Sequence, residues 1–202
     1  PTLSTMGLML QQMGRFDEAV ASCREALRQD PACAEAYNNL GSALRVQGQL
    51  SDAIAAYGEA LRLNSDFAAA YNNLGIALQE QGCPADARTS YQEALRIRPE
   101  FAAAHYNLAT LIGEQGHRAE AIAHLREALR LDPEYSEALS NLLHQSQHLC
   151  DWRHVDELTE RMREMVRSGA SAPISPFAFL TLPTTPGEQL TCARQWVAHR
   201  FD

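Results

Sequence analysis

Four asparagines recur every 34 residues and could bind the backbone of an extended polypeptide: Asn39, Asn73, Asn107 and Asn141. A primary amide can donate to a peptide carbonyl and accept from a peptide N–H, so it can hold a backbone without reading the side chains. Asparagine is a mediocre residue in helix interiors, so its recurrence there calls for a reason. We therefore predict that these four are peptide-binding residues.

The spacing of the asparagines sets the size of the expected ligand. Helices pack about 8 to 10 Å apart and an extended chain rises about 3.3 Å per residue, so four amides would span roughly nine residues. The alternative is that the amides bond to neighbouring helices, or recur only because the unit that carries them is duplicated.

A second group of side chains has the chemistry of a zinc site. His144 and His148 are one helical turn apart, and Cys150 and His154 follow after a predicted helix break. A structural zinc site needs four well-placed ligands, so we expect surface histidines and no metal site. His105 stands in the repeat position that Tyr37 and Tyr71 hold in the preceding units, so we expect its ring to pack between helices and not to bind a ligand.

No catalytic residues are predicted. No G-x-G-x-x-G follows a strand pattern, no phosphate-binding loop occurs, and no Ser, Cys or Asp stands in a recognisable nucleophile setting. We expect these 202 residues by themselves to be inactive.

The composition excludes some classes of partner and indicates the cellular compartment. The net charge is −8 and all 17 basic residues are arginines without a basic tract, so nucleic acid and acidic membranes are not expected partners. The absence of lysine suggests a GC-rich, bacterial genome. Neither a long apolar run nor a signal peptide occurs, which predicts a cytoplasmic protein.

The cysteines favour reduced thiols, because five of them occur without a C-x-x-C pair: Cys23, Cys33, Cys83, Cys150 and Cys192.

The elements that position the asparagines repeat with the same period. Small residues recur in register, in columns such as Gly14, Gly48, Gly82 and Gly116, or Ala19, Ala53, Ala87 and Ala121. Between these columns apolar residues recur three or four apart, so each unit is predicted to be helix, turn, helix. Small residues let the helices cross closely, and a large residue fills the space beside them: Tyr57, Tyr91 or Leu125. Prolines end the second helices: Pro31, Pro99 and Pro133.

The pattern resembles the tetratricopeptide repeat over residues 1–148, about four and a half units, of which 34–67, 68–101 and 102–135 are complete. The resemblance implies an all-α fold, a right-handed superhelix (an α–α solenoid) whose concave groove takes partners. The asparagines fall on the side of each first helix that would line this groove. That side carries no Lys or Arg and Arg45 beside it is isolated, which argues against a clamp for the C-terminal carboxylate of a chaperone.

Residues 149–202 break the repeat and are predicted to form a connector. Cys150-Asp151-Trp152 replaces the expected glycine turn. Asp151 is the expected N-cap of a longer helix with an apolar stripe from Val155 to Val166.

The rest of the connector is rich in proline. Four prolines between 173 and 186 predict an extended, largely non-helical segment held against something apolar. Thr185 and Glu188 then predict a capped start for a last helix, whose Leu190 and Trp196 need a partner surface.

The whole chain resembles the start of a bacterial protein O-linked N-acetylglucosamine (O-GlcNAc) transferase, glycosyltransferase family 41. The resemblance is carried by Tyr-Asn-Asn-Leu-Gly at 37–41 and 71–75, Cys150-Asp151-Trp152, the run from Ser175 to Leu180, and Glu188-Gln189-Leu190. It implies a parent enzyme that transfers GlcNAc from UDP-GlcNAc to Ser or Thr of proteins, with the asparagine ladder holding the acceptor polypeptide.

The same resemblance implies that residues 149–202 begin the catalytic region, and that a C-terminal catalytic domain in cis, with two Rossmann lobes, follows. UDP-GlcNAc would bind there, so no cofactor is expected in this chain. Animal members carry a His-rich stretch near the place of Phe177; its absence here argues against a catalytic role for that segment and fits a bacterial relative.

Two alternatives stay open. The repeats could form a free-standing adaptor that scaffolds another assembly, with residues 149–202 as a closing cap. They could also be fused to another catalytic domain, such as a sulfotransferase, against which Cys150-Asp151-Trp152 argues. Because the sequence starts at Pro1 and ends directly after a predicted helix, we expect a piece of a longer protein.

Overall fold

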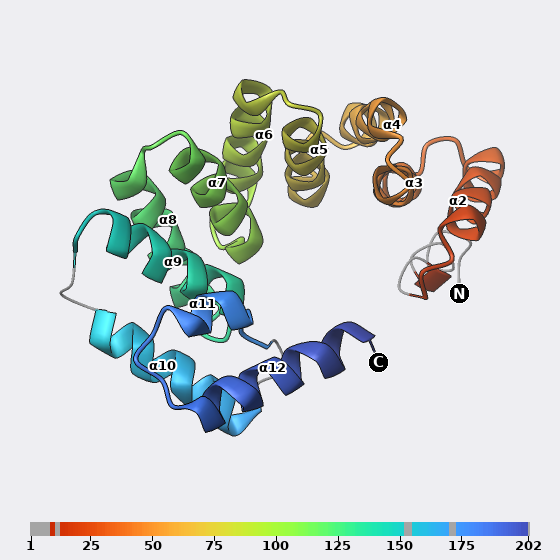
Figure 1. Ribbon diagram of the computed structural model, residues 1–202. Helices are drawn as coiled ribbons and strands as arrows, with labels where there is room; N and C mark the ends of the chain where they lie inside the picture. Colours follow the sequence, from red (N-terminus) through yellow and green to blue (C-terminus); the bar gives the residue numbers. More distant parts are fainter. Residues whose placement is uncertain (1–8, 11–12, 152–154, 170–172, 202) are drawn as a thin grey trace. The chain divides into compact units, whose positions relative to one another are not determined.

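The computed structural model describes residues 9–10, 13–151, 155–169 and 173–201. Every regular element among them is a helix, from α2 to α12 in chain order (Figure 1), so the all-α prediction is confirmed. None of these helices is long and apolar enough to cross a lipid bilayer. The chain packs as two compact units, residues 1–100 and residues 101–202.

The first unit is built of helical hairpins. After α2 (Phe16–Gln29) come two complete pairs, α3 (Ala34–Val46) with α4 (Leu50–Leu63), and α5 (Ala68–Glu80) with α6 (Pro84–Ile97). Each helix packs on the next one in the chain, as the red to yellow-green ribbon of Figure 1 shows. The two pairs match the predicted repeats at 34–67 and 68–101.

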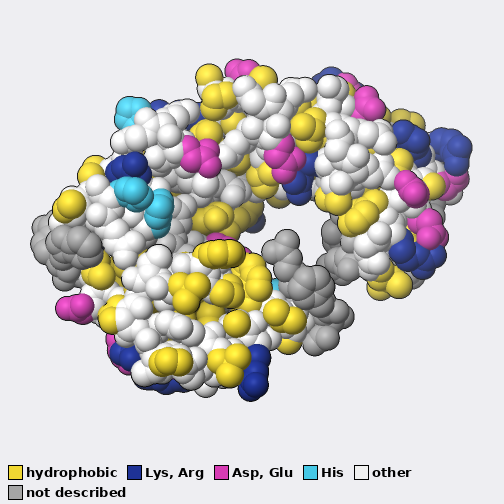
Figure 2. All heavy atoms as spheres, in the orientation of Figure 1, with side chains coloured by type: hydrophobic (Ala, Val, Ile, Leu, Met, Phe, Trp, Pro, Cys, Tyr) yellow, Lys and Arg dark blue, Asp and Glu magenta, His cyan; other side chains and the backbone are white. Residues whose placement is uncertain are grey.

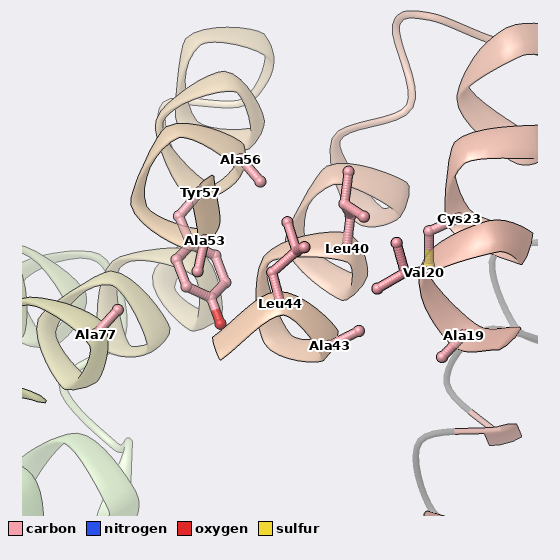
Figure 3. Packing of buried hydrophobic residues seen from close by; sticks show 10 residues of the cluster. All are labelled: Ala19, Val20, Cys23, Leu40, Ala43, Leu44, Ala53, Ala56, Tyr57 and Ala77. Carbon is pink, nitrogen blue, oxygen red and sulfur yellow. The ribbon is translucent and has the colours of Figure 1, made fainter. Parts of the chain in front are cut away.

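The core of the first unit is made of small residues with a few large ones between them. In Figure 3, Leu40 and Leu44 of α3 lie between Tyr57 of α4 and Val20 of α2. Tyr57 is fully buried, and its hydroxyl donates to Ser42 Oγ over 3.1 Å. The buried ring thus keeps a partner for its one polar atom.

Two helix crossings require glycine. A Cβ atom added to Gly41 would lie 2.7 Å from the ring of Tyr57, and one added to Gly75 would lie 2.5 Å from the ring of Tyr91. No real Cβ contact is that short, so the large residue can be accommodated only because the facing residue has no side chain. This confirms the predicted division between small and large columns.

Glycine also closes the turn inside each helical pair. Gly48 has φ 76° and donates its N–H to Arg45 O over 2.9 Å, while Gln49 donates to Leu44 O over 2.9 Å. These two bonds form the Schellman motif, which ends a helix with one residue in the left-handed conformation. Gly82 and Gly116 repeat it, with φ of 84° and 86°.

The second unit begins with the same architecture. It holds the pair α7 (Ala102–Glu114) and α8 (Arg118–Leu131), and then α9 (Ser136–His148), which packs on α8. After α9, Cys150 takes the place of the turn glycine with φ 53°. It donates its N–H to Gln147 O, and Asp151 donates to Ser146 O, both over 3.0 Å. The repeat therefore loses its glycine here while the turn keeps its geometry.

In its described residues the connector forms α10 (Val155–Ser168), α11 (Pro176–Leu180) and α12 (Pro186–Phe201), all in the second unit. α10 packs on both α9 and α12, and α11 packs on α12. The predicted apolar stripe of α10 is buried at Leu158, Met162 and Val166. The expected N-cap role of Asp151 depends on residues 152–154, which lie outside the described residues.

The segment between 173 and 186 contains one short helix. Most of it is non-helical, as predicted, and Pro176–Leu180 within it form the single-turn helix α11. Proline fits the first turn of a helix because the missing N–H would have no partner there, so Pro176 starts α11 instead of preventing it. The predicted capping box of α12 is confirmed: Glu188 Oε2 accepts from Thr185 N–H over 2.9 Å, and Glu188 N–H donates to Thr185 Oγ1 over 3.3 Å.

Candidate peptide-binding surface

The structure places the predicted asparagines at the same position of four successive first helices. Asn39 lies in α3 and Asn73 in α5, both in the first unit, whereas Asn107 lies in α7 and Asn141 in α9, both in the second unit. All four side chains are half-buried. The ladder therefore consists of two pairs of rungs, one pair in each unit.

Two of these amides bond to the preceding repeat. Asn73 Nδ2 donates to Asn38 Oδ1 over 3.0 Å, and Asn141 Nδ2 donates to Thr110 Oγ1 over 3.0 Å. Asn141 Oδ1 also accepts from Gln145 Nε2 over 3.2 Å. Bonds of this kind are what the packing alternative predicts. A bound backbone would share the Asn73 amide with Asn38 and compete with Gln145 for the oxygen of Asn141.

The isolated arginine beside the ladder is engaged in an ion pair. Arg45 Nη1 lies 2.6 Å from Glu80 Oε1, which links α3 to α5. An arginine paired in this way is a poor anchor for a ligand carboxylate, because the ligand would have to replace Glu80.

A pocket of about 440 Å³ lies beside the last rung of the ladder, inside the second unit. One part of the pocket is lined by Asn141 and Glu137 of α9 and by Tyr106 of α7. Another part is lined by Phe177 of α11 and Trp196 of α12. Figure 2 shows hydrophobic side chains gathered on the surface over α11 and α12, and the exposed ones there are Phe177, Leu180, Leu190 and Val197.

The electrostatics of this pocket are simple. Burial raises the pKa of Tyr106, and the nearby Glu137 and Glu114 carboxylates add to that shift. His144, which also lines the pocket, has a pKa that is lowered from its usual range, first by partial desolvation and then by the nearby His148. Among the described residues that line the pocket, Glu137 is the one acidic side chain and none is lysine or arginine.

Sequence reasoning did not find this pocket. The one available signal was the apolar surface of the last helix, where Leu190 and Trp196 were expected to need a partner. Trp196 is half-buried and lines the pocket, whereas Leu190 is exposed. The pocket also requires α11 and α12 to lie near Glu137 and Asn141 of α9. No local sequence pattern indicates that contact.

The histidine and cysteine predictions concern other parts of the chain. The rings of His144 and His148 are edge-to-face with centroids 4.4 Å apart, Cys150 is exposed, and His154 lies outside the described residues. Within the part of the chain that the structure describes, no three His, Cys, Asp or Glu side chains are grouped to hold a metal ion. His105 contacts His124, with the two Nδ1 atoms 2.9 Å apart, so one ring donates to the other.

None of the five cysteines is paired in the structure. Burial raises the pKa of Cys23 to about 11, which leaves it protonated and unreactive at neutral pH.

Comparison with known families identifies the repeats. A model described as TPR repeat matches residues 7–45 and 41–82, and one described as tetratricopeptide repeat matches residues 66–134. The matches together run from residue 7 to residue 134, which is more than half of the chain. The chain belongs to the tetratricopeptide-repeat family.

Solved structures share the fold of this tetratricopeptide-repeat chain at low sequence identity. PilF of Pseudomonas aeruginosa is 21% identical with a TM-score of 0.78, over 97% of this chain and 88% of that one. MamA is 22% identical with a TM-score of 0.70, over 82% of this chain and 97% of that one. YrrB, described as a TPR protein with an unusual peptide-binding site, is 18% identical with a TM-score of 0.61, over 95% of this chain and 90% of that one.

No curated protein sequence matches the chain. The matching family models end at residue 134, so the resemblance of residues 149–202 to a glycosyltransferase stays a prediction.

Proposed function

We propose that this tetratricopeptide-repeat chain binds an extended segment of a partner polypeptide through Asn39, Asn73, Asn107 and Asn141. The observation that carries the proposal is the placement of four half-buried amides at one position of four successive first helices. The peptide-binding site named for YrrB, which has the same fold, supports it.

The amides would act on the backbone of the ligand. Each can donate to a peptide carbonyl and accept from a peptide N–H, so recognition by the ladder depends little on ligand sequence. A single such bond contributes only about 0.5 to 1.5 kcal/mol, but rungs on one continuous ligand act together. Weak single contacts thereby add to a useful affinity.

The test removes one rung from each unit. Asn73→Ala with Asn107→Ala should weaken binding of a fluorescein-labelled Ser/Thr/Ala peptide of about nine residues by roughly tenfold, because two bonds are lost. Fluorescence anisotropy measures the affinity, and circular dichroism should show unchanged helix content.

Asn38→Ala is the matched control for packing. It removes the bond that Asn38 makes with Asn73 while leaving the amide of Asn73 in place. We expect it to change thermal stability as Asn73→Ala does and to leave peptide affinity unchanged. Equal affinity of the wild type and the double variant would contradict the proposal.

We further propose that the chain is the acceptor-binding region of a protein O-GlcNAc transferase-like glycosyltransferase of a bacterial cytoplasm. Cys150-Asp151-Trp152 and the run from Ser175 to Leu180 support this. A catalytic domain in cis would bind UDP-GlcNAc and modify Ser or Thr of the captured polypeptide.

The test of this transferase proposal is the intact mass of the native protein together with the coding sequence beyond Asp202. Two further lobes of alternating strands and helices, with UDP-GlcNAc hydrolysis by the full-length protein, would support it, and a stop soon after Asp202 would contradict it.

A free-standing adaptor is the second candidate. The match to 97% of the MamA chain favours it, because a similar set of helical hairpins forms nearly all of that chain. An adaptor would keep the same polypeptide ladder and lack transferase activity, so the coding sequence and the hydrolysis assay separate the two candidates.

A further inference from the structure

We infer that the pocket between α9 and the connector binds an arginine or lysine side chain of the captured polypeptide. This inference rests on the proposed function, since it adds a side-chain site to a ligand whose backbone the asparagines would hold. It changes the expected ligand from any extended segment to one with a basic residue at a fixed place.

The first argument is the aromatic lining. Tyr106, Phe177 and Trp196 come from three different helices and line the same pocket. A guanidinium or ammonium group over an aromatic ring is attracted by the electron-rich face, most strongly over tryptophan. Phe177 is 82% exposed, so its ring lies open to an occupant.

The second argument is the charge. Glu137 is exposed and accepts a bond from Ser136 Oγ over 3.0 Å, and among the described residues no arginine forms an ion pair with it. Among the described residues that line the pocket, none is lysine or arginine, and the lowered pKa of His144 favours its uncharged form. The described lining therefore has one carboxylate and no Lys or Arg beside it, and a basic side chain would balance that charge.

The third argument is the fit of the side chain to both kinds of wall. A volume of about 440 Å³ lies within the range of pockets that bind small ligands. Arginine and lysine have a long apolar stem and a charged end, so the stem can contact the rings of Phe177 and Trp196 while the end reaches Glu137. An aromatic or aliphatic side chain could fill the same space but would offer the Glu137 carboxylate no opposite charge.

The last argument is continuity with the ladder. Asn141 is a predicted rung and also lines the pocket. A backbone held at Asn141 would therefore place one of its neighbouring side chains at the pocket entrance.

The experiment compares three peptides that differ only at the central residue, which is arginine, citrulline or phenylalanine. Citrulline has the shape of arginine without its charge. Against the wild-type chain we expect the arginine peptide to bind about tenfold tighter than the citrulline peptide, which is the factor expected for one charge-assisted contact with cation–π support. Fluorescence anisotropy at low salt measures all three.

Three variants locate the effect. Glu137→Gln should bring the arginine and citrulline peptides to within about twofold of each other, and Phe177→Leu should weaken the arginine peptide about threefold. Glu134→Gln makes the same charge change at an exposed position outside the pocket and should keep the full preference for arginine.

Trp196 provides an independent readout. The chain has two tryptophans, so Trp152→Phe leaves Trp196 as the only one. We expect the arginine peptide to change the emission of Trp196 and the citrulline peptide to change it much less.

The outcomes separate this inference from the proposed function. If both peptides bind equally and still depend on Asn73 and Asn107, the ladder stands and the basic-residue pocket is overturned. Tighter binding of the phenylalanine peptide would overturn it as well, in favour of an apolar side chain. If no peptide binds, the proposed function fails, and N-acetylarginine methylamide titrated against Trp196 emission decides the pocket alone: Glu137-dependent binding supports it, and no binding overturns it.

Discussion

The two units fill the same helix crossing with different residues. In the first unit Gly75 faces the ring of Tyr91, whereas the same repeat positions in the second unit are Ala109 and Leu125. Tyr91, Ala109 and Leu125 are all buried almost completely. Ala109 has one more carbon than Gly75, and its partner Leu125 is smaller than Tyr91. The two crossings therefore keep a similar summed side-chain volume although the residues differ.

The units differ more where the second one leaves the repeat. α9 has the sequence of a first helix but is followed by the connector α10 to α12 in place of a regular second helix. The pocket with Glu137, Phe177 and Trp196 lies at this departure. Regular repeats use their large side chains for packing between neighbours, and the break in regularity leaves aromatic rings facing a space that a ligand can enter.

The largest predicted effect comes from filling a glycine crossing. Gly75→Ala should destabilise the first unit by about 2 to 3 kcal/mol, because the new Cβ atom would lie 2.5 Å from the ring of Tyr91. Hydrogen exchange should show the loss in α5 and α6 first, since each repeat contacts mainly its neighbours.

Two further variants make this test specific. Gly75→Ala combined with Tyr91→Leu recreates the combination of the second unit and should recover part of the loss. Gly58→Ala lies inside α4, where nothing is within 4 Å of the added Cβ atom, and should stabilise by about 0.5 to 1 kcal/mol through helix propensity. A harmless Gly75→Ala would show that the tyrosine ring can move aside, and the volume comparison would then be wrong.

The next effect concerns the ion pairs that attach the connector. Glu188 contacts Arg163 Nε over 3.2 Å and Arg167 Nη2 over 3.0 Å, which ties α12 to α10. The pKa of Glu188 is lowered to about 2, first by the N–H of Thr185 and then by the two arginines. Because the folded-state pKa lies below the ordinary 4.5, the stabilisation is complete above pH 4.5 and is lost as the pH falls toward 2.

Glu188→Gln should therefore destabilise the second unit at pH 7 and lose part of that difference from the wild type at pH 3. Thermal unfolding followed by circular dichroism at several pH values measures the difference. Glu93→Gln, which breaks an exposed ion pair with Arg96 in the first unit, is the control and should have little effect at either pH. A difference for Glu188→Gln that does not depend on pH would contradict the role of its charge.

Most of the fold could be predicted from the sequence because repeat packing is local. The glycine column predicts the ends of α3, α5 and α7, and the proline column predicts the ends of α6 and α8. Each of these helices ends two residues before the glycine or proline concerned. The left-handed turn at Cys150 could not be predicted from residue type, since cysteine carries none of the preference of glycine.

The candidate site was predicted less completely. The positions of the four asparagines follow from the period, but the bonds of Asn73 to Asn38 and of Asn141 to Thr110 depend on how neighbouring helices are rotated. The pocket depends on contacts between parts of the chain far apart in sequence, such as Tyr106 and Trp196. No periodic pattern carries that information.

The smallest predicted effect tests the one turn that lacks glycine. Cys150→Gly should stabilise the chain by about 0.5 to 1 kcal/mol, because the relief of the left-handed conformation at φ 53° exceeds the added entropy of the unfolded chain. The mirror substitution, Gly116→Cys, places cysteine in the same turn of the preceding repeat, where a Cβ atom would meet nothing within 4 Å, and should cost a similar amount. Thermal unfolding of both variants under reducing conditions compares the two turns without disulfide formation. Opposite changes of equal size in the thermal stability of the two variants would show that a cysteine in this left-handed turn costs the same in both repeats. An unchanged stability of Cys150→Gly would contradict the prediction and show that Cys150 adopts the left-handed conformation without a measurable cost.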